Sequence, residues 1–545
     1  MITAVNYSAA WSTTNLFLTA TFITLAYFLI HAFYNLFLSP LSAIPGPWYY
    51  AISDFWITTH VIRLRQCKAV QDLFEIYGPV VRIGPNKVVF RDISTMRNVY
   101  SVHNNDNDHA MTTLDHAIHS IRRKSYAQHY TPSNVAQFQP EMHEYTFQLI
   151  NHDSISVICT YMRVKSLENI GGKSPVECLA LFRHLMVDVV VSSSFGYRLG
   201  AVGKWAMDVE DPLSTAINDF PKRGILRSIV PAWTWNLVCR IPNSRWRQMC
   251  DSDKILAEFV SARVYEMRGQ VNAGKIGDTE KISMLQRLLG YKYSPTQQMP
   301  DHDIISECIG HLYVFGLLFV GTDLLKHCIS MAGTDTTSTS ITYLFWELSR
   351  RPDIMKKLQM EIDEAIPDCK VLPDMAVLQD LPYLNAFMKE GLRMYTAVPS
   401  LLERIVPSST SKNGATDGIF DLMGYALPPG TVVATQAWSM HRESSVFPSA
   451  DRFIPERWLE SPSTTSSDLS TMAAHMMPFG TGTRICGGQN LAHMMLRLAV
   501  AAFVRNFDVS APSETTAASM DIKDSFVIFP AAMECKLIFT PRATF

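Results

Sequence analysis

The fold is decided by the decamer Phe479-Gly480-Thr481-Gly482-Thr483-Arg484-Ile485-Cys486-Gly487-Gly488. Its glycines leave room for backbone amides to approach the Cys486 sulfur. A helical pattern begins directly after the loop, and the partial positive charge at a helix start stabilises a thiolate. The decamer therefore favours a cysteine that is held as an anionic ligand. The alternative is a structural cysteine beside a glycine turn, which is what most isolated cysteines are.

A second motif with chemical character is Met331-Ala332-Gly333-Thr334-Asp335-Thr336-Thr337. Glycine and consecutive threonines are poor helix formers. A threonine hydroxyl that bonds back to a carbonyl bends an otherwise apolar helix and opens a groove in it. The alternative is a capping segment, in which Thr-x-Thr starts a new helix at about Ser338.

Two further motifs lie between these regions of the chain. Glu390-Gly391-Leu392-Arg393 is an E-x-x-R, 96 residues before Cys486, and Phe453-Ile454-Pro455-Glu456-Arg457-Trp458 follows it. An E-x-x-R on its own indicates only a helical ion pair, which is worth a few tenths of a kcal/mol. Its order and spacing relative to the other motifs make it informative.

Taken in this order, the motifs resemble those of the cytochrome P450 superfamily, and the resemblance extends from a proline-rich hinge near residue 40 to the carboxyl terminus. The cysteine loop of that family, F-x-x-G-x-R-x-C-x-G, is matched by Phe479, Gly482, Arg484, Cys486 and Gly488. The resemblance implies a mainly helical fold with a small β region. It also implies a bound heme b whose iron is axially ligated by the Cys486 thiolate.

The resemblance assigns roles to the other motifs as well. Asp335 and Thr336 would deliver protons to dioxygen, because splitting the O–O bond needs two protons while bulk water is kept out. Glu390, Arg393 and Arg457 would form a buried structural triad in which one carboxylate satisfies two guanidiniums and locks the path to the cysteine.

Matching family positions supply cations for the heme propionates: His119, Arg123, Arg404 and Arg484. For Arg123 and Arg404 the alternative is an ordinary exposed arginine. Arg122, Lys124 and Arg497 form a candidate basic patch for an acidic flavoprotein reductase, with a generic solvated face as the alternative.

Composition sets the broad class of the protein. The 545 residues are 47% hydrophobic and 18% charged, which is enough to bury a sizeable core, and the net charge of −2 argues against nucleic acid as a partner. Ten cysteines are scattered singly with no C-x-x-C pair, so neither a zinc site nor a disulfide framework is indicated. This usage fits a reducing compartment.

The amino terminus is predicted to be a membrane anchor. Residues 1–53 contain no Lys, Arg, Asp or Glu, and the mostly apolar run Leu16–Leu38 would span roughly 34 Å as a helix. A cleaved signal peptide is the alternative, but it normally has a shorter apolar region after a basic start. The first cations, Arg63, Arg65 and Lys68, follow the run and place the body in the cytosol.

The chain is therefore predicted to consist of a lumenal tail and transmembrane anchor at 1–38, a proline-rich hinge at 39–48 and a heme-thiolate domain at 49–545. The protein is expected to cross the endoplasmic reticulum membrane once. Within the domain, a hairpin is predicted from Val80–Ile83 and Lys87–Phe90. Helices are predicted over Asp353–Ala365 and Asn490–Phe507, and strands within 424–435 and 526–539.

One segment departs from the family pattern. Eighteen residues, Tyr313–Ser330, separate a helix that begins near Asp303 from the Gly333 motif. A continuous helix from Asp301 to Arg350 would be roughly 75 Å long, which exceeds a compact domain. We interpret Tyr313–Ser330 as a retained intron of 54 nucleotides translated in a gene model; a genuine apolar insertion is the alternative.

The sequence thus predicts a monooxygenase that inserts one oxygen atom from dioxygen into a lipophilic small molecule, such as a polyketide, terpenoid or alkaloid of a filamentous fungus. Its expected partners are an NADPH-cytochrome reductase, the substrate, dioxygen and the membrane. Two alternatives remain: a dioxygen-independent isomerase or dehydratase, and an inactive membrane-bound heme binder. Tyr126, Phe182 and Phe526 are candidates for the substrate pocket, with packing as the default reading of each.

Overall fold

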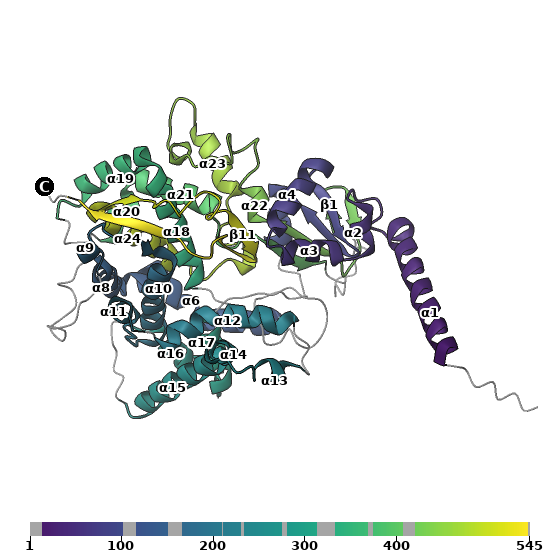
Figure 1. Cartoon of the computed structure of the whole chain (residues 1–545), viewed down its shortest axis with the longest axis horizontal. Helices are drawn as coiled ribbons and strands as arrows, with labels where there is room; N and C mark the ends of the chain where they lie inside the picture. Colours follow the sequence, from purple (N-terminus) through teal and green to yellow (C-terminus); the bar gives the residue numbers. More distant parts are fainter. Residues whose placement is uncertain are drawn as a thin grey trace, which may run out of the picture.

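The computed structural model of the chain describes residues 13–101, 116–150, 166–209, 211–229, 234–274, 281–312, 333–368, 374–406 and 420–542. The protein is mainly helical with small sheets, as the sequence predicts. Figure 1 shows α1 projecting away from the body, which joins a β-containing part beside α1 to a larger helical part.

Helices of the 3-10 or π type carry the label η. Up to residue 101 the elements are α1 (Thr13–Phe33), η1 (Tyr34–Leu38), α2 (Trp48–Ile52), α3 (Phe55–Ile62), α4 (Gln66–Tyr77), β1 (Val80–Gly84), β2 (Lys87–Phe90) and α5 (Ile93–Ser101). From 116 to 312 they are α6 (His116–Ala127), η2 (Gln128–Tyr130), α7 (Pro132–Ala136), α8 (Gln139–Ile150), α9 (Leu167–Ile170), β3 (Val176–Glu177), α10 (Cys178–Phe195), α11 (Ala201–Ala206), α12 (Pro212–Ile229), α13 (Trp235–Val238), α14 (Ser244–Cys250), α15 (Ser252–Asn272), α16 (Met284–Gly290), β4 (Lys292–Ser294), β5 (Gln297–Gln298) and α17 (Asp301–Leu312).

The carboxyl-terminal part begins at α18 and contains the segments with most of the sequence motifs. Its elements are α18 (Asp335–Arg350), α19 (Pro352–Ala365), α20 (Met375–Asp380), α21 (Pro382–Met394), β6 (Leu401–Ile405), β7 (Phe420–Leu422), β8 (Tyr425–Leu427), β9 (Val432–Gln436), α22 (Ala437–Met440), η5 (Pro455–Trp458), α23 (Ser466–His475), η6 (Gly482–Arg484), α24 (Gln489–Asn506), β10 (Phe507–Ser510), β11 (Ile522–Ser525), β12 (Val527–Pro530) and β13 (Lys536–Pro541).

The predicted hairpin is part of a four-stranded sheet with the order β1-β2-β9-β6. Val80 pairs with Phe90 and Val81 with Val89 in antiparallel register, which confirms the hairpin. β9 runs parallel to β2 and antiparallel to β6, so the sheet joins the amino-terminal hairpin to strands more than 300 residues later. Every residue of β1 is buried, including Arg82, whose guanidinium donates to the backbone carbonyls of Asn35, Gly84 and Pro85.

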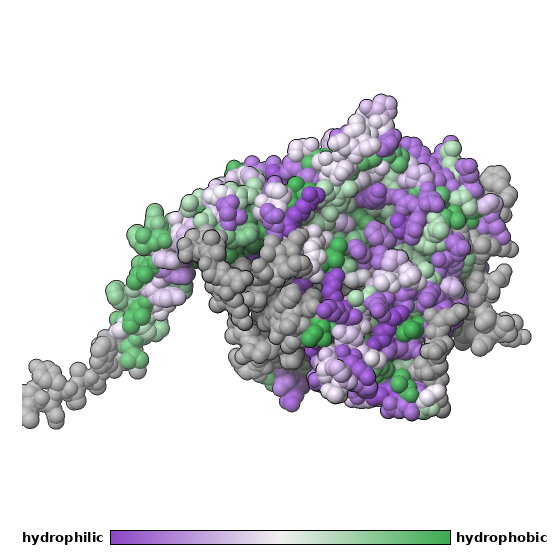
Figure 2. Space-filling view, turned by 180° about the vertical axis from the view of Figure 1, so that it is seen from behind, coloured by the Kyte–Doolittle hydropathy of each residue, from purple (hydrophilic) through white to green (hydrophobic). Residues whose placement is uncertain are grey.

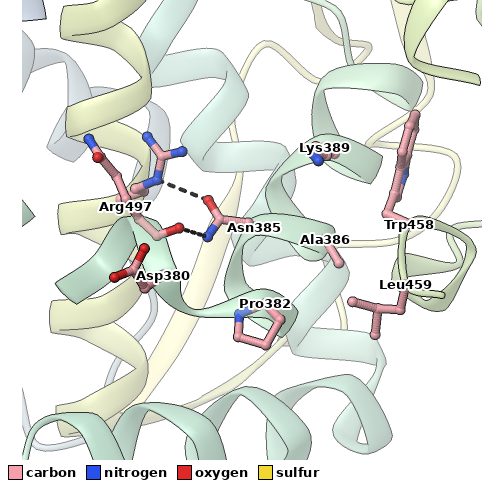
Figure 3. A pocket seen from close by; sticks show the side chains of 9 residues that line it. Asp380, Pro382, Asn385, Ala386, Lys389, Trp458, Leu459 and Arg497 are labelled. Carbon is pink, nitrogen blue, oxygen red and sulfur yellow. Dashed lines mark hydrogen bonds between the residues drawn. The ribbon is translucent and has the colours of Figure 1, made fainter. Parts of the chain in front are cut away.

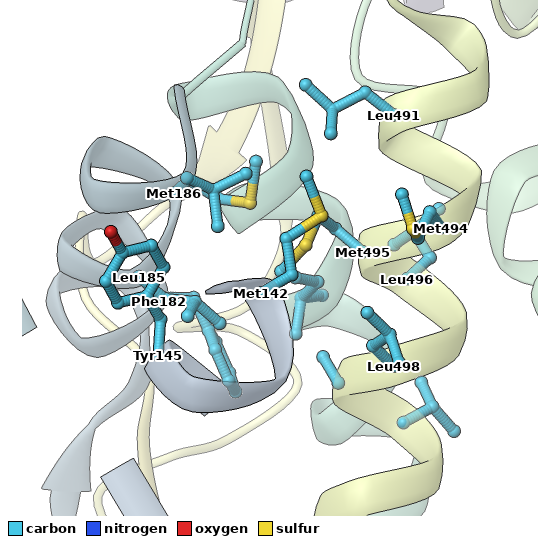
Figure 4. Close-up of a cluster of buried hydrophobic side chains, with 14 of the residues drawn as sticks. Met142, Tyr145, Phe182, Leu185, Met186, Leu491, Met494, Met495, Leu496 and Leu498 are labelled. Atoms are coloured by element: carbon cyan, nitrogen blue, oxygen red, sulfur yellow. The ribbon is translucent and has the colours of Figure 1, made fainter. Parts of the chain in front are cut away.

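The main core lies where α8, α10, α18 and α24 pack together. Figure 4 shows Met142 and Tyr145 of α8 facing Leu185 and Met186 of α10, with Met495 of α24 on the other side. Helix α10 is apolar enough to cross a membrane, but 83% of its length is buried, so it is a core helix. Phe182 of α10 stacks on Phe345 with ring centroids 5.3 Å apart, and it therefore packs the core.

The other predicted elements are confirmed with shifts of about one residue. The helix predicted over Asp353–Ala365 is α19, which starts one residue earlier because Pro352 is favourable in a first turn. The helix predicted over Asn490–Phe507 is α24. The two strand regions contain β8 with β9, and β12 with β13.

The amino-terminal apolar run is helical through α1 and η1. Leu16–Leu38 is long and apolar enough to cross a membrane, and no residue from 16 to 33 is buried by the rest of the protein. Figure 2 shows apolar side chains along this projecting helix, and several exceed 60% exposure, including Phe17, Phe22 and Ile30. A helix of this kind suits a membrane anchor.

The proposed insertion Tyr313–Ser330, together with Met331 and Ala332, lies outside the described residues. Helix α17 ends at Leu312, and α18 begins at Asp335. Thr334 stands at the N-cap position of α18, but its side chain makes no capping hydrogen bond. A helix start at Ser338 is therefore wrong by one turn, and the capping interpretation gains no support from Thr334.

Candidate functional site

Cys486 lies between η6 and the first turn of α24. The backbone N–H of Cys486 donates to the Phe479 carbonyl at 2.8 Å and closes the loop. Burial raises the pKa of the Cys486 thiol, while hydrogen bonds from the backbone N–H groups of Gly488 and Gln489 and the charge of Arg123 act to lower that pKa. Cys486 is nevertheless accessible at the surface of the described part of the chain. Two amides at a helix start are thus aimed at this sulfur, as a thiolate ligand requires.

The loop also depends on a close approach that only glycine permits. Gly482 has φ +71°, and a Cβ built there would lie 1.9 Å from the Tyr100 carbonyl oxygen. A larger residue would therefore push the loop away from α5. On the other side, a Cβ at Gly487 would lie 3.6 Å from the Tyr126 ring and 3.8 Å from the Tyr130 ring. The cysteine loop is therefore packed between Tyr100 on one side and the rings of Tyr126 and Tyr130 on the other.

Two of the predicted propionate partners, Arg123 and Arg484, lie at η6, and Arg404 contacts Tyr100, which borders it. Arg123 donates through Nη1 to the Thr483 carbonyl at 3.1 Å. The Arg404 guanidinium lies 4.6 Å from the centroid of the Tyr100 ring, and Tyr100 contacts the loop at Gly482. Arg484 is the last residue of η6 and is half-buried. Burial lowers the pKa of Arg404, so an anion beside it would relieve the cost of burying its charge.

The remaining candidate, His119, belongs to α6, and its side chain lies outside the described residues. The site as described has a sulfur at a helix start with cations around the same loop. This donor set fits a heme whose iron is bound by a thiolate and whose propionates are bound by arginines.

The first turn of α18 contacts α10. Asp335 accepts a hydrogen bond from Arg183 Nε at 2.9 Å, and both side chains are mostly buried. A Cβ at Gly333 would lie 2.7 Å from Val190, so glycine permits the close packing of the two helices here. Thr336, in the same turn, is half-buried. The relay roles of Asp335 and Thr336 stay predictions, and the structure adds Arg183 as a partner that the sequence did not reveal.

The triad residues meet in the interior. Glu390 Oε1 accepts from Arg393 Nη2 at 2.8 Å and from Arg457 Nε at 3.0 Å. The second oxygen of Glu390 accepts from Arg393 Nε at 2.9 Å and from Trp458 Nε1 at 3.0 Å. Glu390 and Arg393 are fully buried. One carboxylate thus satisfies two guanidiniums and an indole, and this geometry fixes η5 against α21.

The prediction that Arg122 belongs to a basic patch is wrong. Arg122 pairs with Asp303 at 2.7 Å and lies 3.3 Å from Glu307, so its charge is compensated within the protein by α17. Lys124 is exposed. Arg497 donates to Asn385 Oδ1 at 3.0 Å and borders a surface pocket of about 400 Å³ between α20, α21, α24 and η5 (Figure 3). Of the three, Lys124 and Arg497 keep positive charge without a carboxylate partner in the described part of the chain.

Sequence comparison places the site among known proteins. The model of the family described as Cytochrome P450 matches residues 324–537. Cytochrome P450 monooxygenase cypX of Dothistroma septosporum is 28% identical over 532 residues, covering 93% of this chain and 90% of the relative. Cytochrome P450 monooxygenase stcB of Emericella nidulans is 26% identical, covering 92% and 89%. Tryprostatin B 6-hydroxylase of Neosartorya fischeri is 26% identical, covering 88% and 78%.

The family match and these relatives define the protein as a heme-thiolate monooxygenase, an oxidoreductase whose heme iron is held by a cysteine. The chain belongs to the cytochrome P450 superfamily.

Proposed function

We propose that this chain inserts one atom of dioxygen into a C–H or C=C bond of a lipophilic small molecule, with a heme whose iron the Cys486 thiolate would hold. For hydroxylation the balance is one substrate, one dioxygen, one NADPH and one proton giving hydroxylated product, NADP⁺ and water. The observation that carries the proposal is the Cys486 sulfur with the amides of Gly488 and Gln489 directed at it. When bound, the heme supplies dioxygen activation, driven by electrons from a flavoprotein reductase.

The protein's own residues divide the remaining work. Arg123, Arg404 and Arg484 would hold the propionates of the heme by charge-assisted hydrogen bonds. Thr336 donates protons toward the reaction site, and Asp335 resupplies them while Arg183 holds its carboxylate on α10. Glu390, Arg393 and Arg457 keep η5 and α21 in place.

The substrate is proposed to be a secondary metabolite, such as a polyketide, terpenoid or alkaloid. The relative tryprostatin B 6-hydroxylase is named for the hydroxylation of a small molecule, which supports the reaction type. Phe526 stands at the turn between β11 and β12, where Ser525 pairs with Val527, and it has a φ of 70°. Figure 1 shows β11 in the body of the protein. We assign Phe526 to the substrate pocket. A residue other than glycine keeps a positive φ only where the surrounding structure holds it there, and such residues cluster at functional sites.

We place the protein in the endoplasmic reticulum membrane as a single-pass protein with residues 49–545 in the cytosol. The apolar helix of residues 16–38 supports the anchor, and Arg63, Arg65 and Lys68 after it support the orientation. A cytosolic body has access to NADPH and to a membrane-bound reductase.

The test is turnover of the full-length protein with reductase, NADPH and ¹⁸O-labelled dioxygen, using a library of lipophilic metabolites. The substrate is first found by displacement of water from the ferric iron, read as a change in the absorption spectrum. One labelled oxygen per product with NADPH consumption supports the proposal. Product formed without NADPH indicates an isomerase or dehydratase, and binding without any product indicates an inactive heme binder; either result would overturn it.

A further inference from the structure

His441 is a fully buried residue between α22 and the segment that leads to η5. Its Nε2 accepts a hydrogen bond from the Met477 backbone N–H at 2.8 Å. Its Nδ1 lies 2.8 Å from Thr396 Oγ1 and 3.1 Å from the Arg393 carbonyl oxygen. One imidazole therefore contacts the end of α21 with one nitrogen and the residues before the cysteine loop with the other.

The contacts define the protonation of the ring. Nε2 must be unprotonated because it accepts from Met477, so Nδ1 carries the hydrogen. The Thr396 hydroxyl donates to the Leu392 carbonyl at 2.6 Å, which leaves its oxygen to accept from Nδ1–H. Burial lowers the pKa of His441 to about 3, with the nearby charges of Arg442 and Arg393 acting in the same direction. The ring is therefore neutral at working pH, in the tautomer that both contacts require.

The two ends of this bridge belong to the parts of the site that must be aligned. On one side, Arg393 of the triad donates through Nη1 to the His441 carbonyl at 2.9 Å. On the other side, the Met477 carbonyl accepts from the Gly480 N–H at 3.0 Å, and the Phe479 carbonyl accepts from the Cys486 N–H. Hydrogen bonds thus run from α21 through His441 and Met477 into the cysteine loop.

The triad alone does not make this connection within the described part of the chain. Its guanidiniums bind backbone carbonyls of Pro448, Ser449, Arg452 and His441, and Glu390 binds the Ile454 N–H. These contacts fix the chain at residues 441–454, and Met477 lies 23 residues further on. His441 is the side chain whose contacts connect the end of α21 to Met477.

We propose that His441 is a positioning residue for the heme ligand: its neutral imidazole fixes Met477 relative to α21, and so holds the cysteine loop with the Cys486 sulfur facing the amides of Gly488 and Gln489. The proposal rests on the proposed function, because it takes Cys486 as the ligand. Loss of the bridge lets residues 477–480 shift, and the sulfur then loses the amides that stabilise its negative charge.

Two substitutions separate this role from simple filling of space. Glutamine places a polar atom near the position of Nε2 and can still accept from the Met477 N–H, whereas asparagine reaches only the position of Nδ1. His441→Gln and His441→Asn therefore differ in whether Met477 keeps its partner. His475→Asn is the matched control, because the hydrogen bond of His475 Nδ1 goes to the Thr471 carbonyl of its own helix and its ring packs edge-on against Phe447.

The first readout is hydrogen exchange of the peptide containing residues 477–480 in the full-length heme-loaded protein, measured by mass spectrometry. We expect exchange about tenfold faster in His441→Asn, because a buried amide loses its acceptor, and near wild-type exchange in His441→Gln and His475→Asn. The second readout is the absorption of the reduced carbon monoxide complex. His441→Asn should convert part of the protein to the form without thiolate ligation, and His441→Gln should not.

Equal exchange and equal spectra for the glutamine and asparagine variants would overturn the proposal, since a merely structural residue would respond alike to both. Cys486→Ser in parallel tests the proposed function. If that variant retained thiolate-type absorption, the ligand assignment would be wrong. The exchange comparison reports on the bridge itself, so the two failures are distinguishable.

Discussion

At the scale of single residues, Asp335 shows how one contact changes the reading of a motif. An acid next to a threonine in a helical groove suggests a proton relay, but Arg183 holds the Asp335 carboxylate against α10 at 2.9 Å. The hydroxyl of Thr336 is uncharged and can both donate and accept a proton. We therefore expect Thr336 to control proton delivery more directly than Asp335.

Thr336→Ala should retain heme and the thiolate-type spectrum while diverting reducing equivalents to hydrogen peroxide. Cys486 and its amide donors are untouched, but the last proton donor is lost. The measurement is product and peroxide formed per NADPH, and we expect the product yield to fall about tenfold or more. Thr339→Ala, one turn further along α18, is the control. A coupling ratio equal to that of the wild type would remove Thr336 from the relay.

The contact between Arg183 and Asp335 could not be predicted from the sequence. Asp335 and Arg183 are 152 residues apart, and nothing near Arg183 distinguishes it from a surface arginine. His441 was missed for the same reason, because its partners Thr396 and Met477 become neighbours only in the fold. By contrast, the cysteine loop was predictable because Cys486 and its amide donors are within three residues of one another.

At the scale of elements, α6 and α17 are joined by a buried charge cluster. Arg122 of α6 binds Asp303 and Glu307 of α17, and Tyr293 donates to Asp303 at 2.9 Å. Burial raises the pKa of Glu307 from its ordinary 4.5 to about 7. The charge of Asp303 contributes to this increase, and Arg122 opposes it. Glu307 also lies near Tyr126, whose pKa burial raises to about 12. The cluster therefore makes the junction between these helices sensitive to pH.

Glu307→Gln should change the pH dependence of stability. The folded protein keeps the Glu307 proton up to about pH 7, whereas the unfolded chain releases it near pH 4.5. The contribution of this group to stability is therefore present below pH 4.5 and is lost as pH rises toward 7. Relative to the always neutral glutamine, the wild type should lose up to about 3 kcal/mol across that range.

The measurement is the free energy of unfolding of both proteins in urea at pH 5, 6, 7 and 8. Glu364→Gln, which alters an exposed carboxylate of α19, is measured alongside as a surface control. A difference between wild type and Glu307→Gln that is constant from pH 5 to 8 would show that Glu307 does not titrate in this way.

Regular elements were predictable where periodicity or turn chemistry is local. The helices at 353–365 and 490–507 and the hairpin at residues 80–90 were found within about one residue. The start of α18 was harder, because threonines are compatible with both a cap and a bent helix. We retain as a proposal that Tyr313–Ser330 derives from an unspliced intron, which sequencing of the mature transcript decides.

At the scale of the whole molecule, the anchor and the body meet at η1. The Arg82 guanidinium donates to the Asn35 carbonyl at 2.7 Å, and Asn35 is buried. In the helix before it, α1, no residue from 16 to 33 is buried by the body. The boundary between a removable anchor and the folded body thus lies at about residue 33.

Deletion of residues 1–33 should convert an integral membrane protein into one that alkaline carbonate releases from membranes. The five residues of η1 are too short to span a bilayer, and the body keeps the Arg82 contact. Release is measured by sedimentation of washed membranes, and the heme spectrum should be unchanged. Deletion of residues 1–38 is the comparison, and it should be less stable because Arg82 loses its buried acceptor. Retention of the shorter deletion in the membrane pellet would show that the body itself is embedded.

The central claim is that the Cys486 thiolate holds the heme iron, and the reduced carbon monoxide complex of Cys486→Ser tests it most directly. The wild type should absorb in the Soret region at the long-wavelength position characteristic of thiolate ligation, and Cys178→Ser, which alters a buried core cysteine, should do the same. Cys486→Ser should lose that band completely. A Cys486→Ser protein that binds heme and keeps the wild-type band would contradict the account.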